Sequence, residues 1–337
     1  MKASLPVGKL PAELLAGLLR QAPILDPRIL LGPGIGLDCA VIEYGSRYLV
    51  FKSDPITFAT DQIGWYAVQV NVNDIATCGA VPRWMLISLL LPEGKTSYAT
   101  VAQVINQVYD ACIKLGISVI GGHTEITSDL DRVIVAATIV GEVEKDKLVT
   151  PRGARPGNAL LLTKGIPIEA TALIARERAS LLRDRLNSDE LRIAENFLYE
   201  PGISVLTDAR IALGAGGVTA MHDPTEGGLA AALWELAEAS QVSIHVNEDA
   251  IPVPEISRRI CQLLDIDPLA AISSGALLMA VQAEQALNVQ STLEKAGILC
   301  AQIGEIDKPP VGVFKSSGSS SGALPRPERD AITRLFE

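Results

Sequence analysis

The sequence has few aromatic residues and few histidines, and its shortages exclude several classes of protein. Aromatic residues make up 4% of the 337 residues against 48% hydrophobic residues, so its cores must be mainly aliphatic. There is no run of basic residues and the net charge is −10, which argues against a nucleic-acid-binding surface. Only three histidines occur, so each is a candidate for a specific role.

Paired cysteines and long apolar segments are also missing. The five cysteines form no CxxC pair and their number is odd, which argues against a disulfide framework or a zinc knuckle. The first ten residues lack the apolar core of a signal peptide. The longest apolar stretch, near Met85 to Leu91, is too short to span a bilayer. We therefore expect a cytoplasmic protein with neither a membrane nor a nucleic acid as partner.

The length suits two domains, and a linker-like segment marks their boundary. Residues 150–157 read Thr-Pro-Arg-Gly-Ala-Arg-Pro-Gly, so we expect domains at 1–150 and 151–337. Predicted strands and helices alternate in both halves, and several strands have the size of antiparallel ones, which predicts an α+β fold. The Ser/Gly-rich residues 315–322 predict a mobile loop, and we expect 315–337 to be partly flexible.

No Walker-type phosphate loop is present, but three acids stand at the ends of apolar runs in the first quarter: Asp38, Asp54 and Asp74. Carboxylates hold Mg²⁺, and Mg²⁺ holds a triphosphate. Two carboxylates about 5 Å apart repel by ~3 kcal/mol at an effective dielectric constant near 20. Either these acids share a cation or they do not converge, and their spacing alone leaves both alternatives open.

Each acid also has an ordinary structural interpretation. Asp54 precedes Pro55, so the pair could form a simple turn. Asp38 follows the glycine cluster 32–36 and could belong to that turn. Asp74 lies in an apolar helical stretch, where we expect partial burial and therefore a partner, which could be a salt bridge, a cap or a ligand.

Two glycine pairs lie beside polar residues. Gly121-Gly122-His123-Thr124-Glu125 follows a predicted strand at 117–120, so backbone could approach a ligand there. Residues 222–228 read His-Asp-Pro-Thr-Glu-Gly-Gly between a predicted strand and a helix at 229–240. This arrangement binds anions through free N–H groups, and it also suits a helix capped by Thr225. His245 lies in an alternating strand and predicts a structural role, whereas the role of His222 stays open.

Together these motifs resemble the aminoimidazole ribonucleotide (AIR) synthetase superfamily, and within it the AIR-synthase-related, HypE-like group. The resemblance runs from about Leu10 to about Ile306. The motifs that carry it, in order, are Gly-Pro-Gly-Ile-Gly-Leu-Asp-Cys-Ala-Val-Ile (32–42), Asp54-Pro55-Ile56-Thr57, Asn73-Asp74 with Gly79-Ala80-x-Pro82, Gly-Gly-His-Thr-Glu (121–125) and Asp-Pro-Thr-Glu-Gly-Gly (223–228).

The resemblance implies a two-domain PurM-like fold. Its N-terminal α/β domain would dimerise through a β-barrel, and its C-terminal domain would be an α+β sandwich. The cofactors would be ATP and Mg²⁺, bound near the dimer interface. The implied metal ligands are Asp38, Asp54 and Asp74. The implied nucleotide-binding residues are Lys52, Thr57, Asn73, Gly121, Gly122, Thr124, Thr225, Gly227 and Gly228, and the implied catalytic residues are His123, Glu125 and Asp223.

The chain departs from its relatives at three points. Leu37 stands where relatives often have a second acid, and His123 stands where kinase-like relatives have Asp. The carbamoyl dehydratases of the group end in a reactive cysteine, whereas no cysteine follows Cys300 here. The first hypothesis is a homodimeric, Mg²⁺-dependent, ATP-using enzyme that phosphorylates or dehydrates a small acceptor. The alternatives are a non-catalytic nucleotide-binding or scaffold protein, and a hydrogenase-maturation factor lacking that cysteine.

Overall fold

The computed structural model describes residue 5 and residues 7–337, and it divides into two compact units. The smaller unit contains Asp26–Leu31 and Cys39–Leu148. The larger unit contains Val149–Glu337 together with Met1–Leu25 and Gly32–Asp38. Residues 1–4 and 6, part of the stretch where the sequence lacks a signal peptide, lie outside the described residues.

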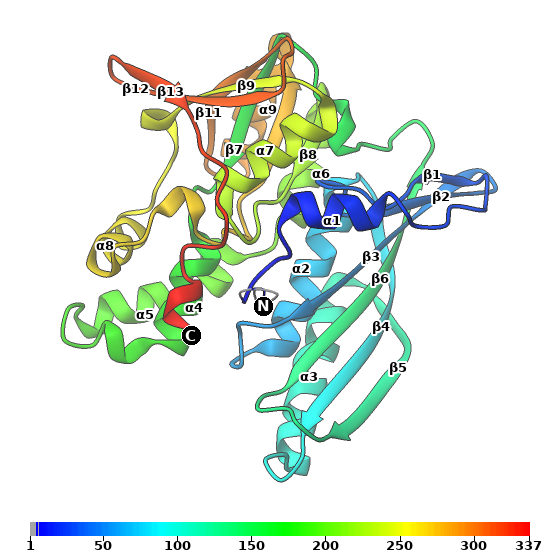
Figure 1. Cartoon of the computed structure of the whole chain (residues 1–337), viewed down its shortest axis with the longest axis vertical. Helices are drawn as coiled ribbons and strands as arrows, with labels where there is room; N and C mark the ends of the chain where they lie inside the picture. Colours follow the sequence, from blue (N-terminus) through cyan, green and yellow to red (C-terminus); the bar gives the residue numbers. More distant parts are fainter. Residues whose placement is uncertain (1–4, 6) are drawn as a thin grey trace. The chain divides into compact units, whose positions relative to one another are not determined.

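The smaller unit contains a six-stranded sheet in the order β1-β2-β3-β6-β4-β5 (Figure 1). Its pairs are antiparallel except β4 with β5, which is parallel. The strands are β1 (Ile29–Leu31), β2 (Ala40–Tyr44), β3 (Arg47–Ile56), β4 (Val81–Pro92), β5 (Ser118–Thr127) and β6 (Ile134–Glu144).

Two helices cover one face of this sheet, α2 (Ile63–Thr77) and α3 (Tyr98–Leu115) (Figure 1). Helix α3 forms because both of its ends are capped. The Ser97 side chain accepts a hydrogen bond from the Thr100 N–H, and Gly116 ends the helix with φ 69°. All residues of α2 except Trp65 are buried, which confirms that Asp74 is buried.

The larger unit contains a seven-stranded sheet in the order β13-β12-β9-β11-β7-β10-β8. Its strands are β7 (Asn158–Thr163), β8 (Val218–His222), β9 (Ser243–Asn247), β10 (Leu278–Gln282), β11 (Cys300–Asp307), β12 (Gly312–Ser317) and β13 (Ser320–Ala323). Its α-helices are α1 (Ala12–Leu19), α4 (Ile168–Glu177), α5 (Ser188–Asn196), α6 (Leu206–Ala215), α7 (Gly228–Ser240), α8 (Glu255–Leu264) and α9 (Ala283–Lys295).

The core of the larger unit is built around β7, whose six residues are all buried. Leu160 and Leu162 join a cluster with the apolar face of α7, including Leu233. Leu161 lies between them and points to the opposite face by strand alternation. Because both faces are covered, β7 reads as a continuous apolar run. The mixed sheets confirm the α+β fold. No helix of the described residues is long and apolar enough to cross a membrane.

Two local predictions were wrong. The strand expected at 117–120 continues to Thr127, so Gly121 and Gly122 lie inside β5. Glycine is needed at these positions because β5 packs closely against β4, and the chain does not turn there. The Ser/Gly-rich residues 315–322, expected to form a loop, belong to a hairpin of β12 and β13 because their backbone groups pair with each other, and their mobility stays a prediction.

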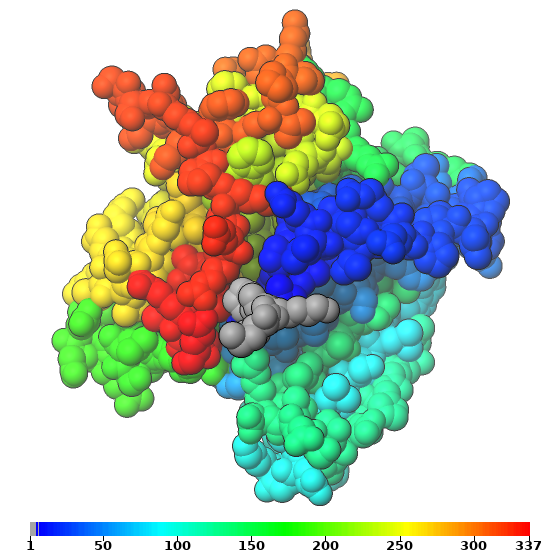
Figure 2. Space-filling model, viewed as in Figure 1, coloured from blue at the N-terminus to red at the C-terminus, as the bar shows by residue number. Residues whose placement is uncertain are grey.

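The last residues of the chain pack against the rest of the larger unit. Figure 2 shows them in red against the yellow and green parts of the surface. Ile332 is fully buried, the Ala331 N–H donates to the Ala270 carbonyl at 3.0 Å, and Arg178 stacks on Phe336 at 4.3 Å. These contacts hold the end of the chain against the larger unit. The flexibility of residues 315–337 stays a prediction.

Gly122 allows β4 and β5 to pair, so we expect Gly122→Ala to destabilise the smaller unit. Its φ is +149°, and an added Cβ would lie 1.8 Å from the Ile87 carbonyl oxygen. We expect a loss of about 3 kcal/mol in urea unfolding because strain and overpacking add. Gly116→Ala is the control, since its Cβ would meet open space and would carry only the left-handed strain of about 1 kcal/mol. Equal losses in the two variants would contradict this account.

Candidate functional site

Asp54 and Asp74 converge in the smaller unit, and a lysine lies between them. Lys52 Nζ is 3.0 Å from Asp54 Oδ2 and 3.1 Å from Asp74 Oδ2. The Asp74 side chain is 2% exposed, so its charge needs a close cation. Lys52 and Asp54 point the same way because they are two residues apart on β3. The ammonium group of Lys52 therefore offsets the repulsion between the two carboxylates.

Helix α2 holds this group in place. The Asn71 side chain accepts from the Asp54 N–H at 2.9 Å and donates to the Asp54 carbonyl at 3.3 Å, which ties α2 to β3. The Thr77 hydroxyl donates to the Asp74 carbonyl at 2.8 Å. Asn73 is fully buried beside Asp74, and Thr57 follows the end of β3 half-buried. A fixed pair of carboxylates offers the hard oxygen donors that Mg²⁺ prefers.

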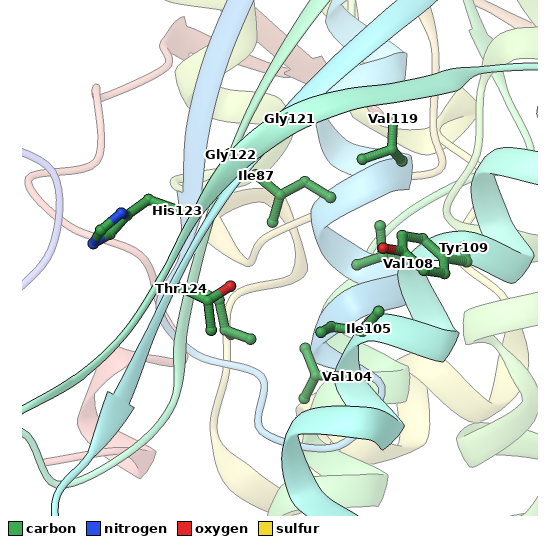
Figure 3. Close-up of a pocket in the computed structure, with 11 residues that line it drawn as sticks. Ile87, Val104, Ile105, Val108, Tyr109, Val119, Gly121, Gly122, His123 and Thr124 are labelled. Carbon is green, nitrogen blue, oxygen red and sulfur yellow. The ribbon is translucent and has the colours of Figure 1, made fainter. Parts of the chain in front are cut away.

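The residues of β5 lie on two faces of the sheet. His123 and Glu125 share the face away from α3, and their Nε2 and Oε2 atoms are 3.0 Å apart. Thr124 points to the other side, towards α3, as strand alternation requires (Figure 3). The structure therefore separates Thr124 from the imidazole of His123, although the two are neighbours in the motif.

A cavity of about 370 Å³ lies between β5, β4 and α3. Figure 3 shows side chains of α3, among them Val104 and Tyr109, facing Val119 and Ile87 of the sheet. Most of the lining residues are apolar, and the polar ones are Thr124, Tyr109 and His123. Three residues expected to bind the nucleotide, Gly121, Gly122 and Thr124, therefore line one cavity.

In the larger unit, Asp38 lies beside a buried histidine. His222 ends β8 and is 1% exposed; its Nδ1 is 3.4 Å from Asp38 Oδ2 and its Nε2 is 2.8 Å from Glu235 Oε2. Burial lowers the pKa of His222, but the Asp38 charge and the hydrogen bond with Glu235 outweigh it and raise the pKa to about 9. Asp223 follows directly and is fully buried.

The loop 223–228 is held from two sides. Lys9 Nζ donates to the Thr225 hydroxyl at 3.0 Å and lies 3.4 Å from Glu226 Oε2. The Gly227 N–H donates to Asp330 Oδ2 at 2.7 Å. The alternative in which Thr225 caps the helix was wrong: Gly227, with φ 84°, precedes α7, and the Thr225 side chain makes no cap hydrogen bond. The side chain faces Lys9 instead. An added Cβ on Gly228 would lie 2.5 Å from the Leu269 carbonyl.

Sequence reasoning missed Lys9, Asp330 and Glu169 around this loop. Glu169 lies in the first turn of α4 and is 6% exposed. Burial raises the pKa of its carboxyl to about 7; Ser274 lowers it, and the charges of Glu226 and Asp330 raise it. Burial also raises the pKa of Asp330 to about 6, against hydrogen bonds from Ile332 and Gly227. An acid near a helix start is common in sequences, so no local signal marks Glu169 as buried.

Family models match most of the chain. The model described as AIR synthase related protein, N-terminal domain, matches residues 36–143, and the corresponding C-terminal domain model matches residues 155–315. Both matched ranges contain the candidate residues described above, with Asp38 to Glu125 in the first and Glu169 and His222 to Gly228 in the second.

Similar proteins come from several organisms. The chain is 31% identical over 264 residues to a putative hydrogenase expression/formation protein of Methanocaldococcus jannaschii, which covers 75% of each chain. It is 29% identical over 284 residues to the carbamoyl dehydratase HypE of Escherichia coli, covering 80% of this chain and 79% of that protein. A crystal structure of the hydrogenase maturation protein HypE in complex with ATP has a TM-score of 0.68 and 25% identity, covering 93% of this chain and 90% of that one.

The raised pKa of Glu169 predicts that stability falls as pH rises. The unfolded carboxyl loses its proton near pH 4.5, whereas the folded one keeps it to about pH 7, so unfolding becomes easier across this range. The full effect is about 3 kcal/mol. We expect Glu169→Gln to gain stability relative to the wild type between pH 5 and pH 8 in urea unfolding. Glu284→Gln, an exposed acid at the matching position of α9, is the control and should show no such gain.

Proposed function

The chain belongs to the AIR synthase-related family, and on that premise we propose that it is a Mg²⁺-dependent, ATP-using enzyme that phosphorylates or dehydrates a small acceptor. The observation that carries the proposal is the buried Asp74 carboxylate, which Lys52 joins to Asp54. Burying an acid and a lysine together costs desolvation energy, and such groups are often kept for function. The HypE structure in complex with ATP supports the nucleotide assignment.

In this proposal the carboxylates of Asp54 and Asp74 would hold the metal, and Asp38 of the larger unit would be a further metal ligand. Bound Mg²⁺ would neutralise charge on the phosphates and orient them for transfer. Lys52 would then turn its ammonium group towards a phosphate oxygen, because the metal takes over its role between the acids. Asn73 and Thr57 would complete the polar wall beside the nucleotide.

The other residues would position phosphate and move protons. The backbones of Gly121 and Gly122 would admit the phosphates, and Thr124 would contribute its hydroxyl. His123 would exchange a proton with the acceptor while Glu125, 3.0 Å away, holds its ring. In the larger unit, Thr225, Gly227 and Gly228 would contact the nucleotide at the start of α7, and Asp223 would act in catalysis.

We propose an acceptor chemistry that does not use a thiol of the described chain. All five cysteines are buried and free. Burial raises the pKa of the Cys261 and Cys300 thiols to about 12 and that of Cys112 to about 11. Such thiols carry little thiolate at neutral pH and are poor nucleophiles.

We also propose a homodimer formed through the sheet of the smaller unit. On the face away from α3, Leu86 is 41% exposed and Ile120 57% exposed, beside His123. Exposed aliphatic side chains grouped on a sheet are typical of an interface. A barrel shared between two copies would bury them.

The metal assignment predicts that ATP binding depends on Mg²⁺ and on Asp74. In calorimetric titrations, we expect the wild type to bind ATP at least tenfold more tightly with Mg²⁺ than without it, and Asp74→Asn to lose this difference. Asp54→Asn should lose it too, with less risk to folding because Asp54 is 37% exposed. Asp131→Asn, a fully exposed acid, is the control. Unchanged Mg²⁺-dependent ATP binding in both Asp74→Asn and Asp54→Asn would contradict the proposal.

The proposed dimer leads us to expect that charged side chains on the sheet face away from α3 would separate the two copies. We expect the wild type to have the mass of a dimer in light scattering after size exclusion, and Leu86→Glu with Ile120→Glu to give a monomer, because buried charges disfavour the interface. Ile113→Glu, on the outer side of α3 and 76% exposed, should stay dimeric. A monomeric wild type would contradict the interface.

One observation favours a second function, a non-catalytic nucleotide-binding protein. Lys52 already balances Asp54 and Asp74, so the two acids are compatible with folding without a metal. ADP release measured with a panel of small acceptors separates the two functions, since turnover with any acceptor eliminates the second.

A further inference from the structure

Three potential metal ligands meet at the end of β8 in the larger unit. Asp38, His222 and Asp223 each offer one donor atom, and these atoms all lie within 4.8 Å of one another. His222 and Asp223 are buried, and Asp38 is partly exposed. Two oxygen donors and one imidazole nitrogen are a common set for a divalent first-row metal ion.

The imidazole of His222 is oriented as a metal ligand would be. Its Nε2 lies 2.8 Å from Glu235 Oε2, so it can donate a hydrogen bond to that carboxylate. Metal-binding histidines in proteins are usually held in this way by a carboxylate on the ring nitrogen away from the metal. Glu235 comes from α7 and is mostly buried, so the ring is fixed from the side opposite Asp38.

The other ring nitrogen points into the cluster. His222 is 1% exposed, and its Nδ1 has no hydrogen-bond partner among residue 5 and residues 7–337. This nitrogen forms an ion pair with Asp38 Oδ2 at a distance of 3.4 Å. A buried imidazole nitrogen without a hydrogen bond is costly unless something binds it. This nitrogen faces the two aspartates, and a metal ion bound there would take the place of its proton.

We propose that Asp38, His222 and Asp223 form a mixed nitrogen–oxygen site for a divalent transition-metal ion, with Glu235 as the positioning residue of His222. The inference deepens the proposed function, because Asp38 is also one of its expected metal ligands. Mg²⁺ is bound almost entirely by oxygen ligands. An imidazole nitrogen binds the divalent ions from Mn²⁺ to Zn²⁺ more strongly than it binds Mg²⁺. His222 thus makes this end of the site selective against Mg²⁺.

The test uses Mn²⁺ as the probe, with the full chain, no histidine tag and no nucleotide. Pulsed electron paramagnetic resonance detects ¹⁴N coupling when an imidazole binds Mn²⁺. We expect this coupling in the wild type, and equally in His123→Gln with His245→Gln, which leaves His222 as the only histidine of the chain. Absence of the coupling from either protein would overturn the proposal.

Affinities give the second measurement. We expect His222→Gln to weaken Mn²⁺ binding at least tenfold and Mg²⁺ binding much less, and Glu235→Gln to weaken Mn²⁺ binding about tenfold. Equal Mn²⁺ affinity in His222→Gln and the wild type would mean that His222 serves only as a buried partner of the two acids. Asp54→Asn is the control for the proposed function: it should lose Mg²⁺-dependent ATP binding and keep the nitrogen coupling, so either proposal can fail alone.

Discussion

The buried charge of Asp74 constrains the smaller unit more than any other single group. An unpaired carboxylate at 2% exposure would cost several kcal/mol, so β3 must deliver Lys52 to it. Lys52 also binds Asp54, which Asn71 ties to α2 through two backbone hydrogen bonds. The packing of α2 on β3, the direction of three side chains and the candidate site therefore depend on one charge balance.

The larger unit also buries acidic side chains, and it stabilises them in two ways. In one, the acid is paired with a basic residue: Lys164 lies 3.1 Å from Asp208, and both side chains are almost fully buried. Where none is close enough, the acid keeps its proton, as the raised pKa of Glu169 indicates. His222 stands between these cases, because the two carboxylates on its ring nitrogens suit either a proton or a metal ion. The proposed metal site is a consequence of this balance.

Position on an element decides which candidate residues can act together. Alternation along β5 places His123 and Glu125 on one face and Thr124 on the other, towards α3. The His123–Glu125 pair and the contact of Thr124 with the cavity thus belong to opposite sides of one strand. On the loop before α7, the Gly227 N–H donates to the Asp330 carboxylate, while Thr225 turns to Lys9.

Local patterns determined much of this protein by themselves. The caps of α3, the apolar run of β7 and the burial of Asp74 follow from neighbours in the sequence, because helix and strand periodicity is a short-range property. The order of the motifs also identified the family. Only the tertiary structure decided that Lys52 joins two acids, that β5 continues through Gly121 and Gly122, and that Glu169 is buried beside Ser274. These features depend on residues far apart in the chain, and no spacing rule predicts which side chains the packing brings together.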